Sequence, residues 1–247
     1  MFSKIKKRNN ANLMSKLKLI TPQHVAIIMD GNNRWTKKHK LKGFVGHEKG
    51  IDSIQNAVDT AKLFNIKYLT LFIFSSENWS RPKKEVNFLM KLLRKYLSEK
   101  INKLIKDNIS IKMIGDKKKL PKDIVKKIDE YEKMTSKNKG LNLIFALNYG
   151  SRNEILHSLK MIINKFKKKK FLINEEIISS NLFTSKIPDP DLLIRTSGEK
   201  RLSNFLLWQL AYSEIFFVKK LWPDFNEKDY IKIIKSFKRI KRNFGNI

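Results

Sequence analysis

Short runs of apolar residues alternate along this chain with longer segments in which apolar residues recur every three or four positions. The short runs are typical of strands buried on both faces, and the longer segments of amphipathic helices. Strands are expected at Val25–Met29, Tyr68–Phe74, Ile109–Ile114, Leu141–Leu147, Leu192–Ile194 and Ile215–Val218. Helices are expected near His47–Phe64, after Pro82, from Pro121 to Met134, after Gly150, near Glu175–Phe183, over Phe205–Tyr212 and from Asn226.

Strands that alternate with helices predict an α/β fold, here a central, mostly parallel six-stranded sheet with helices on both faces. The 247 residues fit one large domain, and no repeat or linker divides the chain. Residues 1–20 contain no acidic residue and six basic ones. We expect these 20 residues to form a basic, flexible tail, although a short helix that touches anionic lipid is an alternative. Residues 21–247 are the expected folded domain.

Polar clusters follow four of the expected strands, at Asp30–Arg34, Ser75–Arg81, Asn148–Arg152 and Arg195–Ser203. In open α/β sheets, ligands bind at the carboxyl ends of the strands, so these clusters are expected to converge on one rim. The Asp30 carboxylate could hold a divalent cation, and the Arg34 guanidinium could bind phosphate. The alternative is that Asp-Gly-Asn-Asn forms an ordinary strand-to-helix turn.

Two further residues are candidates for a site. Glu214 lies in one of the most apolar parts of the chain, where a carboxylate needs a metal ion or an arginine as partner. A purely structural ion pair would satisfy it equally well. His47 follows Gly46 at the start of an expected helix, where anions bind. The other three histidines are expected to be structural or surface residues.

The formal net charge of +30 suggests nucleic acid or an anionic membrane as a partner. The charge comes from 44 lysines and only nine arginines, and the lysines are spread over nearly all polar segments. Four arginines (34, 81, 195 and 201) lie in the polar clusters, and arginine binds phosphate with two parallel hydrogen bonds. We therefore expect a phosphorylated small substrate, and no nucleic acid.

The absence of certain motifs narrows the function further. There is no cysteine, which excludes disulfides and thiolate metal sites and fits a reducing compartment. No apolar run is long enough to span a membrane and no signal-peptide core is present, so a cytoplasmic location is expected. Neither nucleotide-binding glycine motif occurs, and no pair of D-D-x-x-D magnesium motifs is present.

Six motifs together resemble the cis-prenyltransferases. They are HVAIIMDGNNRW at 24–35, FSSENWSRP at 74–82, NYG at 148–150, DLLIRTSGE at 191–199, RLSNFLLWQLAYSE at 201–214 and WPDF at 222–225. The resemblance extends from about Thr21 to Gly245, with all motifs in order, and is most like the bacterial members. It identifies residues 21–247 as a catalytic domain.

The resemblance implies a homodimeric, Mg²⁺-dependent transferase. Such an enzyme condenses isopentenyl diphosphate repeatedly onto farnesyl diphosphate with cis double bonds. The expected product is a long-chain polyprenyl diphosphate such as undecaprenyl diphosphate, the lipid carrier precursor for cell-wall glycan synthesis. A peripheral contact with the inner face of an anionic membrane is a further expectation. A non-catalytic partner subunit of another prenyltransferase is the main alternative, and a nucleic-acid-binding protein is the weaker one.

Residue roles follow from the resemblance by position. Asp30 coordinates magnesium and assists departure of the allylic diphosphate, and Asn78 lies near the proton to be removed. The allylic diphosphate is bound by Gly31, Asn32, Asn33, Arg34 and His47, with Trp35 and Gly43 beside it. A mobile loop that arranges the substrates contains Ser75, Ser76, Glu77, Trp79 and Arg81. Isopentenyl diphosphate is bound by Arg195, Arg201, Leu202 and Ser203. Glu214, in the same chain or from a partner subunit, completes the magnesium site.

The sequence departs from the family pattern at four positions. Asn33 and Ser197 each replace a common glycine, and Asn33 is expected to preserve the loop because asparagine tolerates left-handed backbone angles. Gly43 stands where an arginine is usual, which removes a phosphate contact that Lys42 would have to replace. Ile73 is bulkier than the usual residue and is expected to narrow the product tunnel.

Overall fold

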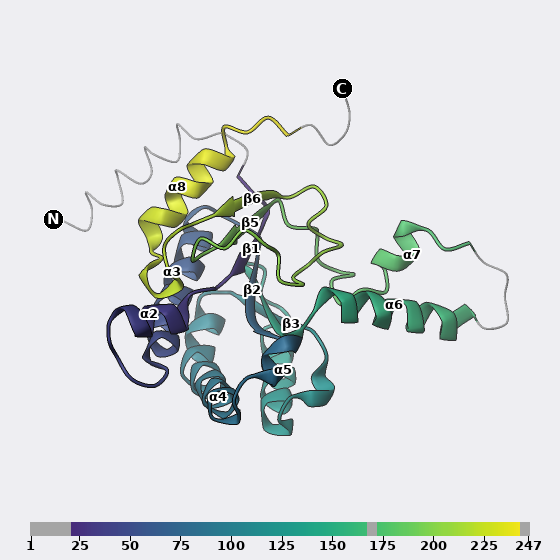
Figure 1. Cartoon of the computed structure of the whole chain (residues 1–247). Coiled ribbons are helices and arrows are strands. Elements are labelled where there is room, and N and C mark those ends of the chain that lie inside the picture. The colour runs from purple at the N-terminus through teal and green to yellow at the C-terminus, as the bar shows by residue number, and fades with distance from the viewer. Residues whose placement is uncertain (1–20, 167–171, 243–247) are drawn as a thin grey trace.

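A six-stranded parallel sheet lies at the centre of the computed structural model, which describes residues 21–166 and 172–242 (Figure 1). The strands are β1 (His24–Ile28), β2 (Tyr68–Ser75), β3 (Ser110–Ile114), β4 (Asn142–Tyr149), β5 (Leu192–Arg195) and β6 (Glu214–Phe217). Their order is β3-β4-β2-β1-β5-β6, and every neighbouring pair is parallel. The predicted α/β fold is confirmed, and β1 lies in the interior of the sheet.

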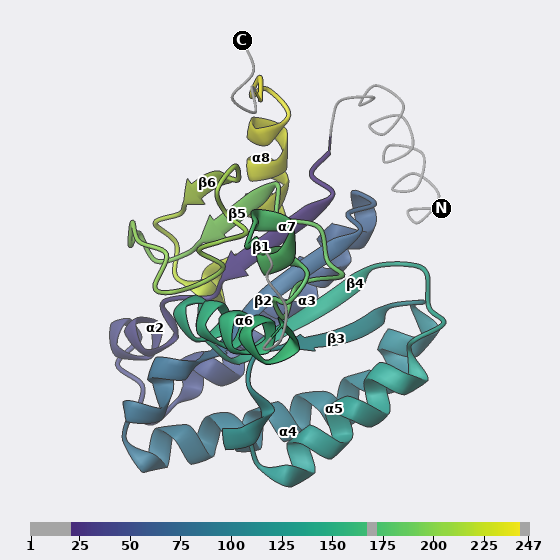
Figure 2. The same cartoon turned by 90° about the vertical axis from the view of Figure 1, so that its right-hand side faces the viewer.

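Parallel pairing requires long crossover connections between strands. Helices form most of these connections, whereas β5 and β6 are joined by a segment of turns. The helices are α2 (Asn32–Lys38), α3 (Val45–Leu63), α4 (Lys83–Lys106), α5 (Lys122–Met134), α6 (Ser151–Phe166), α7 (Glu175–Ser179) and α8 (Glu227–Phe237). Short 3₁₀ helices lie at Ser76–Ser80 (η1), Lys117–Lys119 (η2) and Trp222–Asp224 (η3). Figure 2 shows α4 and α5 together along one side of the molecule, with α6 crossing in front of the strands.

Alternate residues of β1 enter two separate hydrophobic cores. Val25 and Ile27 face a core that includes apolar residues of α3, α4, α5 and α8. Ala26 and Ile28 face the second core, which contains Phe205, among other residues of the loop after β5. Because both faces are covered, the strand is apolar at every position from Val25 to Ile28, as the sequence pattern predicted.

The helix predicted over Phe205–Tyr212 is wrong, because this segment forms a series of turns. Ser203, Asn204 and Leu206 have positive φ angles of 49°, 60° and 46°, which a right-handed helix does not permit. Phe205 and Leu206 are nonetheless fully buried against the sheet. The apolar residues of this irregular segment are buried, and their spacing in the sequence resembles that of an amphipathic helix. That spacing misled the prediction. The helix predicted to reach Phe183 is also shorter, since α7 ends at Ser179.

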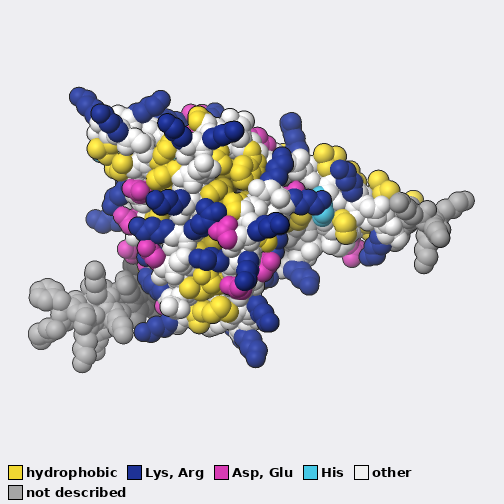
Figure 3. All heavy atoms as spheres, turned by 90° about the horizontal axis from the view of Figure 1, so that it is seen from below, with side chains coloured by type: hydrophobic (Ala, Val, Ile, Leu, Met, Phe, Trp, Pro, Cys, Tyr) yellow, Lys and Arg dark blue, Asp and Glu magenta, His cyan; other side chains and the backbone are white. Residues whose placement is uncertain are grey.

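Basic side chains are scattered over the surface. In the view of Figure 3, Lys and Arg side chains lie all over the visible face, between acidic side chains and apolar patches. No single basic stripe is visible on that face. This distribution agrees with the diffuse lysine pattern of the sequence. The predicted basic tail, residues 1–20, lies outside the described residues.

Candidate active site

A tight turn joins the end of β1 to α2 and carries Asp30. Gly31 in this turn has a φ of 113°, a conformation that favours glycine. A Cβ atom at Gly31 would lie 2.9 Å from the Leu221 side chain, so a larger residue would also collide there. Helix α2 begins at the next residue. The turn therefore places the Asp30 carboxylate at the carboxyl end of the sheet, as predicted.

Asp30 lies between two arginines. Arg195 Nη2 donates to Asp30 Oδ2 at 2.8 Å, and Arg34 Nη2 is 3.1 Å from Oδ1. Arg195 ends β5, the neighbour of β1, and its side chain is only 4% exposed. Burial by itself would raise the pKa of Asp30, but hydrogen bonds from Arg195 and Ser197 and the two positive charges lower it below its usual value. Asp30 is therefore ionised at neutral pH.

Glu199 links the two sides of this arginine cluster. Its carboxylate pairs with Arg34 at 3.0 Å and also with Arg201. Arg195 in turn donates to Ser203 Oγ at 2.8 Å and to the backbone oxygen of Arg201. The arginines predicted for two different diphosphates thus form one connected network. Sequence reasoning did not assign a role to Glu199, although it lies within a quoted motif.

The loop after β2 folds into η1. Ser75 caps η1, and Asn78 Oδ1 accepts a hydrogen bond from the Ser75 backbone N–H at 3.0 Å. The Glu77 carboxylate accepts hydrogen bonds from the hydroxyls of Ser75 and Ser76, and from Asn204 Nδ2 at 2.7 Å. The loop is therefore held by its own polar side chains and by a contact with the segment after β5.

Glu85, at the start of α4, joins two of the predicted site residues. Its Oε1 accepts hydrogen bonds from Arg81 Nη1 at 2.8 Å and from Asn33 Nδ2 at 3.0 Å. Sequence reasoning missed Glu85 because an acidic residue in the first turn of a helix is ordinary. We expected Asn33 to preserve the loop by adopting a left-handed backbone angle, and this reason is wrong. Asn33 has no positive φ, and the left-handed residue of the turn is Gly31.

The polar clusters surround a cavity of about 670 Å³. The predicted site residues that line it are Asp30, Gly31, Asn32, Asn33, Arg34, His47, Ser75, Glu77, Asn78, Arg81, Arg195, Arg201 and Ser203. Arg152 and Asn204 also line this cavity. All four clusters that follow strands therefore contribute to one rim. Strand order, rather than sequence distance, brings them together.

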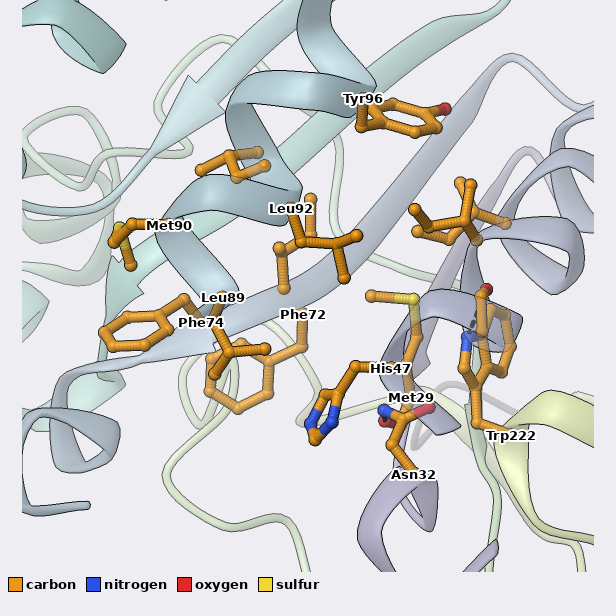
Figure 4. Close-up of a pocket in the computed structure, with 15 residues that line it drawn as sticks. Met29, Asn32, His47, Phe72, Phe74, Leu89, Met90, Leu92, Tyr96 and Trp222 are labelled. Atoms are coloured by element: carbon orange, nitrogen blue, oxygen red, sulfur yellow. Dashed lines mark hydrogen bonds between the residues drawn. The ribbon is translucent and has the colours of Figure 1, made fainter. Parts of the chain in front are cut away.

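A smaller, apolar cavity of about 90 Å³ adjoins the polar one (Figure 4). Met29, Ile73 and Leu89 line both cavities, and so do Asn32 and His47. Figure 4 shows His47 and Asn32 at one end of the apolar residues, with Tyr96 on α4 at the other. The polar cavity is therefore continuous with an apolar one.

His47 lies at the junction of the two cavities. Burial lowers its pKa to about 4, and the nearby charge of Glu85, which raises the pKa, does not compensate. Its Nδ1 atom is buried and has no hydrogen-bond partner among the residues that the structure describes. A neutral imidazole with a free nitrogen could donate to or accept from a ligand group at this junction.

Several predicted site residues do not line the polar cavity. Trp35 donates to Asp224 at 2.7 Å and so fastens α2 to η3, and Trp79 donates to Asn148 at 2.7 Å. Leu202 packs against the second core.

Ser76 lines a neighbouring cavity next to η2 instead. Gly43 lies in the turn between α2 and α3 with a φ of 69°, and a Cβ there would meet no atom within 4 Å.

Glu214 lies at the far end of the sheet from Asp30. It is the first residue of β6 and pairs with Leu192, whereas Arg195, the neighbour of Asp30, pairs with Phe217. Three residues of strand span roughly 10 Å. Glu214 is also half-buried on an edge strand rather than enclosed in the core. Within a single chain it does not share a metal site with Asp30.

The fit of magnesium rests on Asp30. Among the residues that the structure describes, no group of three or more His, Asp or Glu side chains could hold a metal ion. Mg²⁺ is commonly bound through one or two carboxylates together with substrate phosphates, and does not require an all-protein cage. A single ionised carboxylate at the rim of a cavity lined by arginines is compatible with that mode of binding.

Comparison with known proteins agrees with this arrangement. A family model described as "Putative undecaprenyl diphosphate synthase" matches residues 28–245. The isoprenyl transferase of Aquifex pyrophilus is 48% identical over 231 residues, which cover 94% of this chain and 99% of that protein. The isoprenyl transferase of Thermotoga maritima is 46% identical over 227 residues, covering 92% of this chain and 97% of that protein.

Two solved structures share the fold. Lavandulyl diphosphate synthase from Lavandula x intermedia, in complex with dimethylallyl diphosphate, has a TM-score of 0.88 and 37% identity, covering 92% of this chain and 99% of its own. A probable undecaprenyl diphosphate synthase from Campylobacter jejuni has a TM-score of 0.78 and 36% identity, covering 92% and 100%. Matches of this extent make the protein a prenyltransferase. It belongs to the cis-prenyltransferase family.

Proposed function

We propose that this enzyme condenses isopentenyl diphosphate repeatedly onto an allylic diphosphate, with farnesyl diphosphate as primer, and forms cis double bonds. The product is a long-chain polyprenyl diphosphate such as undecaprenyl diphosphate. One observation carries the proposal: the arginine-lined cavity opens into an apolar cavity at Asn32, His47 and Ile73. A substrate with a diphosphate head and a hydrocarbon tail requires both parts.

The allylic diphosphate is assigned to the side of the cavity beside α2. Arg34 is partly exposed and can turn from Glu199 toward an incoming phosphate, since surface ion pairs are weak. His47 lies where the head group would meet the tail, and its free nitrogen supports a role in orienting the head group. Each charge-assisted hydrogen bond to phosphate would contribute about 1.5–3 kcal/mol.

Isopentenyl diphosphate is assigned to Arg195, Arg201 and Ser203. Arg195 and Ser203 already contact each other, and the largely exposed Arg201 side chain can reach a ligand in the same cavity. With both substrates in place, a carbon–carbon bond forms between the allylic carbon and the isopentenyl unit, while diphosphate leaves the allylic carbon and the isopentenyl unit loses a proton. Asn78, on the wall of the cavity, is assigned to orient the atoms near that proton.

Asp30 is the residue that would hold Mg²⁺, together with substrate phosphates. Bound magnesium would offset the negative charge that develops on the departing diphosphate. Asp30 also keeps Arg195 oriented, and this contact does not depend on a metal ion. Glu214 can contribute to such a site only from a partner subunit, because of its place at the far end of β6.

A homodimer is part of the proposal. Strand β6 is an edge of the sheet, and Ile215 and Phe217 on it are exposed, as is Tyr212 just before it. Edge strands that carry large apolar side chains are commonly covered by another chain. Pairing of two chains at β6 would bury these residues and place Glu214 in the interface. Light scattering of the purified protein tests the dimer, and a monomer at micromolar concentration would contradict it.

Location is proposed to be cytoplasmic, with peripheral contact at the inner face of the membrane. Among the described helices, none combines the length and the apolar character that crossing a bilayer demands. The excess of lysine and the oily product support contact with anionic lipid. Failure to sediment with anionic vesicles at low salt would contradict this contact.

The decisive experiment is an incubation with labelled isopentenyl diphosphate, farnesyl diphosphate and Mg²⁺, followed by chromatography of the dephosphorylated products. We expect long prenyl products that disappear when the metal is chelated. No product from the purified protein would contradict the proposal. A product that appears only after a second prenyltransferase subunit is added would instead favour the non-catalytic partner.

A further inference from the structure

Asn204 connects three segments that are far apart in the sequence. Its backbone oxygen accepts a hydrogen bond from the Ser151 N–H at 2.8 Å, and its Oδ1 accepts one from the Arg152 N–H at 2.9 Å. Its Nδ2 donates to Glu77 Oε1 at 2.7 Å. One side chain therefore joins the segment after β5 to the start of α6 and to η1.

The surrounding backbone is shaped for this contact. A Cβ at Gly150 would lie 2.7 Å from Asn204 Nδ2 and 2.3 Å from Ser76 Oγ, so a larger residue there would displace the side chain that contacts Glu77. Asn204 itself has a φ of 60°, where asparagine is among the best tolerated residues after glycine. Glycine would satisfy that backbone angle but could not supply the donor to Glu77.

The hydrogen bond from Asn204 also favours the ionised form of Glu77. Burial by itself would raise the pKa of Glu77, but hydrogen bonds from Asn204, Ser75 and Ser76 lower it below its usual value. Ser75 and Ser76 belong to the same loop as Glu77, whereas Asn204 belongs to the other side of the cavity. The hydrogen bond from Asn204 therefore joins Glu77 to the opposite side of the cavity.

We propose that Asn204 is a positioning residue that couples the loop at 75–81 to the site at Arg201 and Ser203. This inference rests on the proposed function, in which that site binds isopentenyl diphosphate. Asn204 directly follows Ser203 in the chain, so a ligand that orders Ser203 also orders Asn204. Asn204 then holds Glu77, and through it the loop, over the bound substrates.

The test exchanges the donor and the acceptor. Asn204→Asp keeps the acceptor for Arg152 and tolerates the backbone angle, but sets one carboxylate against that of Glu77. Adding Glu77→Gln restores one amide donor and one carboxylate acceptor in reversed order. We expect Asn204→Asp to lower kcat/KM for isopentenyl diphosphate by about tenfold or more. The double variant should recover to within about threefold of Glu77→Gln alone.

A second readout does not depend on activity. Hydrogen–deuterium exchange of residues 75–81 should accelerate severalfold in Asn204→Asp and return toward the wild-type rate in the double variant. The matched control is Asn108→Asp, because Asn108 also has a positive φ and its Oδ1 also accepts a backbone N–H, from Lys139, in a turn before β3. This control should change neither the kinetics nor the exchange of the loop.

Three outcomes would overturn the proposal. The first is that Asn204→Asp and Asn108→Asp behave alike. The second is that the effects of Asn204→Asp and Glu77→Gln on kcat/KM simply multiply in the double variant. The third is that hydrogen–deuterium exchange of residues 75–81 does not change in Asn204→Asp. If Asn204→Asp does not fold, Glu77→Ala takes its place. The proposal then requires faster hydrogen–deuterium exchange of residues 75–81 in Glu77→Ala, and an unchanged exchange rate would overturn it. If the wild-type protein incorporates no isopentenyl diphosphate, the proposed function fails, while the exchange experiment still decides whether Asn204 holds the loop.

Discussion

Arg195 donates a hydrogen bond to Asp30 at 2.8 Å, although 165 positions separate the two residues in the sequence. The contact exists because β5 pairs with β1 in a register that sets Arg195 opposite Ile28, two residues before Asp30. Asp30 balances the charge of a nearly buried guanidinium, which also donates to Ser203. The carboxylate proposed to hold magnesium and the arginine proposed to bind isopentenyl diphosphate thus stabilise each other.

Replacing Asp30 by asparagine should affect both activity and stability. Asp30→Asn removes the negative charge that Arg195 faces, and should destabilise the fold by about 2–4 kcal/mol. Activity should fall at least about a hundredfold, because the metal ligand is also lost. Urea denaturation and incorporation of labelled isopentenyl diphosphate measure the two effects.

Asp52→Asn is the control, since Asp52 forms an exposed ion pair with Lys49. Asp52→Asn should lower the free energy of unfolding by less than about 1 kcal/mol. Equal destabilisation by the two substitutions would contradict the role of the Asp30–Arg195 contact.

Stability should fall as the pH falls from about 6.5 to about 4, in part because of His24. Its Nδ1 donates to the Pro188 carbonyl at 2.6 Å, so its Nε2 accepts from the Thr70 hydroxyl at 2.7 Å. Burial lowers the pKa of His24 to about 4, against raising contributions from Pro188 and the Asp191 charge. Between 4 and 6.5 the unfolded chain binds a proton that the folded chain does not, so acid favours unfolding.

Between pH 6.5 and pH 4, His24 is expected to lower the free energy of unfolding by roughly 3 kcal/mol. The variant His24→Gln should show a correspondingly shallower decline of the unfolding free energy, measured by urea denaturation at several pH values. His47, whose pKa is also lowered to about 4, leaves part of the decline in place. An unchanged slope in His24→Gln would show that His24 is not buried in its neutral form.

Ile73 should limit the length of the product. It lines both the polar and the apolar cavity, on β2. Ile73→Ala would widen the passage and is expected to shift the products toward longer chains, while Ile73→Phe should shorten them. Chromatography of the dephosphorylated products measures the shift. An identical product distribution in both variants would exclude Ile73 as a determinant of chain length.

Gly43→Arg should strengthen binding of the allylic diphosphate. The positive φ of Gly43 imposes a cost of about 1–2 kcal/mol on any side chain, but no atom lies within 4 Å of the new Cβ. The added guanidinium is expected to lower the KM for farnesyl diphosphate severalfold. Gly43→Ala is the control, because it carries the same backbone strain without the charge. Equal KM values for the two variants would contradict the prediction.

Local patterns were enough to predict most elements of this fold. Apolar runs such as Val25–Met29 reflect burial on both faces of a strand. The four polar clusters follow strands because polar groups in the loops at strand ends contact water or ligands. The resemblance in six motifs added the family, which the comparisons confirm. The lysine-rich composition, in contrast, predicted little about the site, because the lysines are spread over nearly all polar segments of the chain.

Contacts over long sequence distances were decided only by the tertiary structure. The sequence does not state that β5 lies beside β1, and therefore does not predict that Arg195 meets Asp30. It also could not show that Glu85 joins Asn33 to Arg81, or that Glu214 begins β6 at the opposite end of the sheet. Strand pairing depends on which faces pack together across the whole chain, whereas hydrophobic periodicity reports only whether a segment is buried.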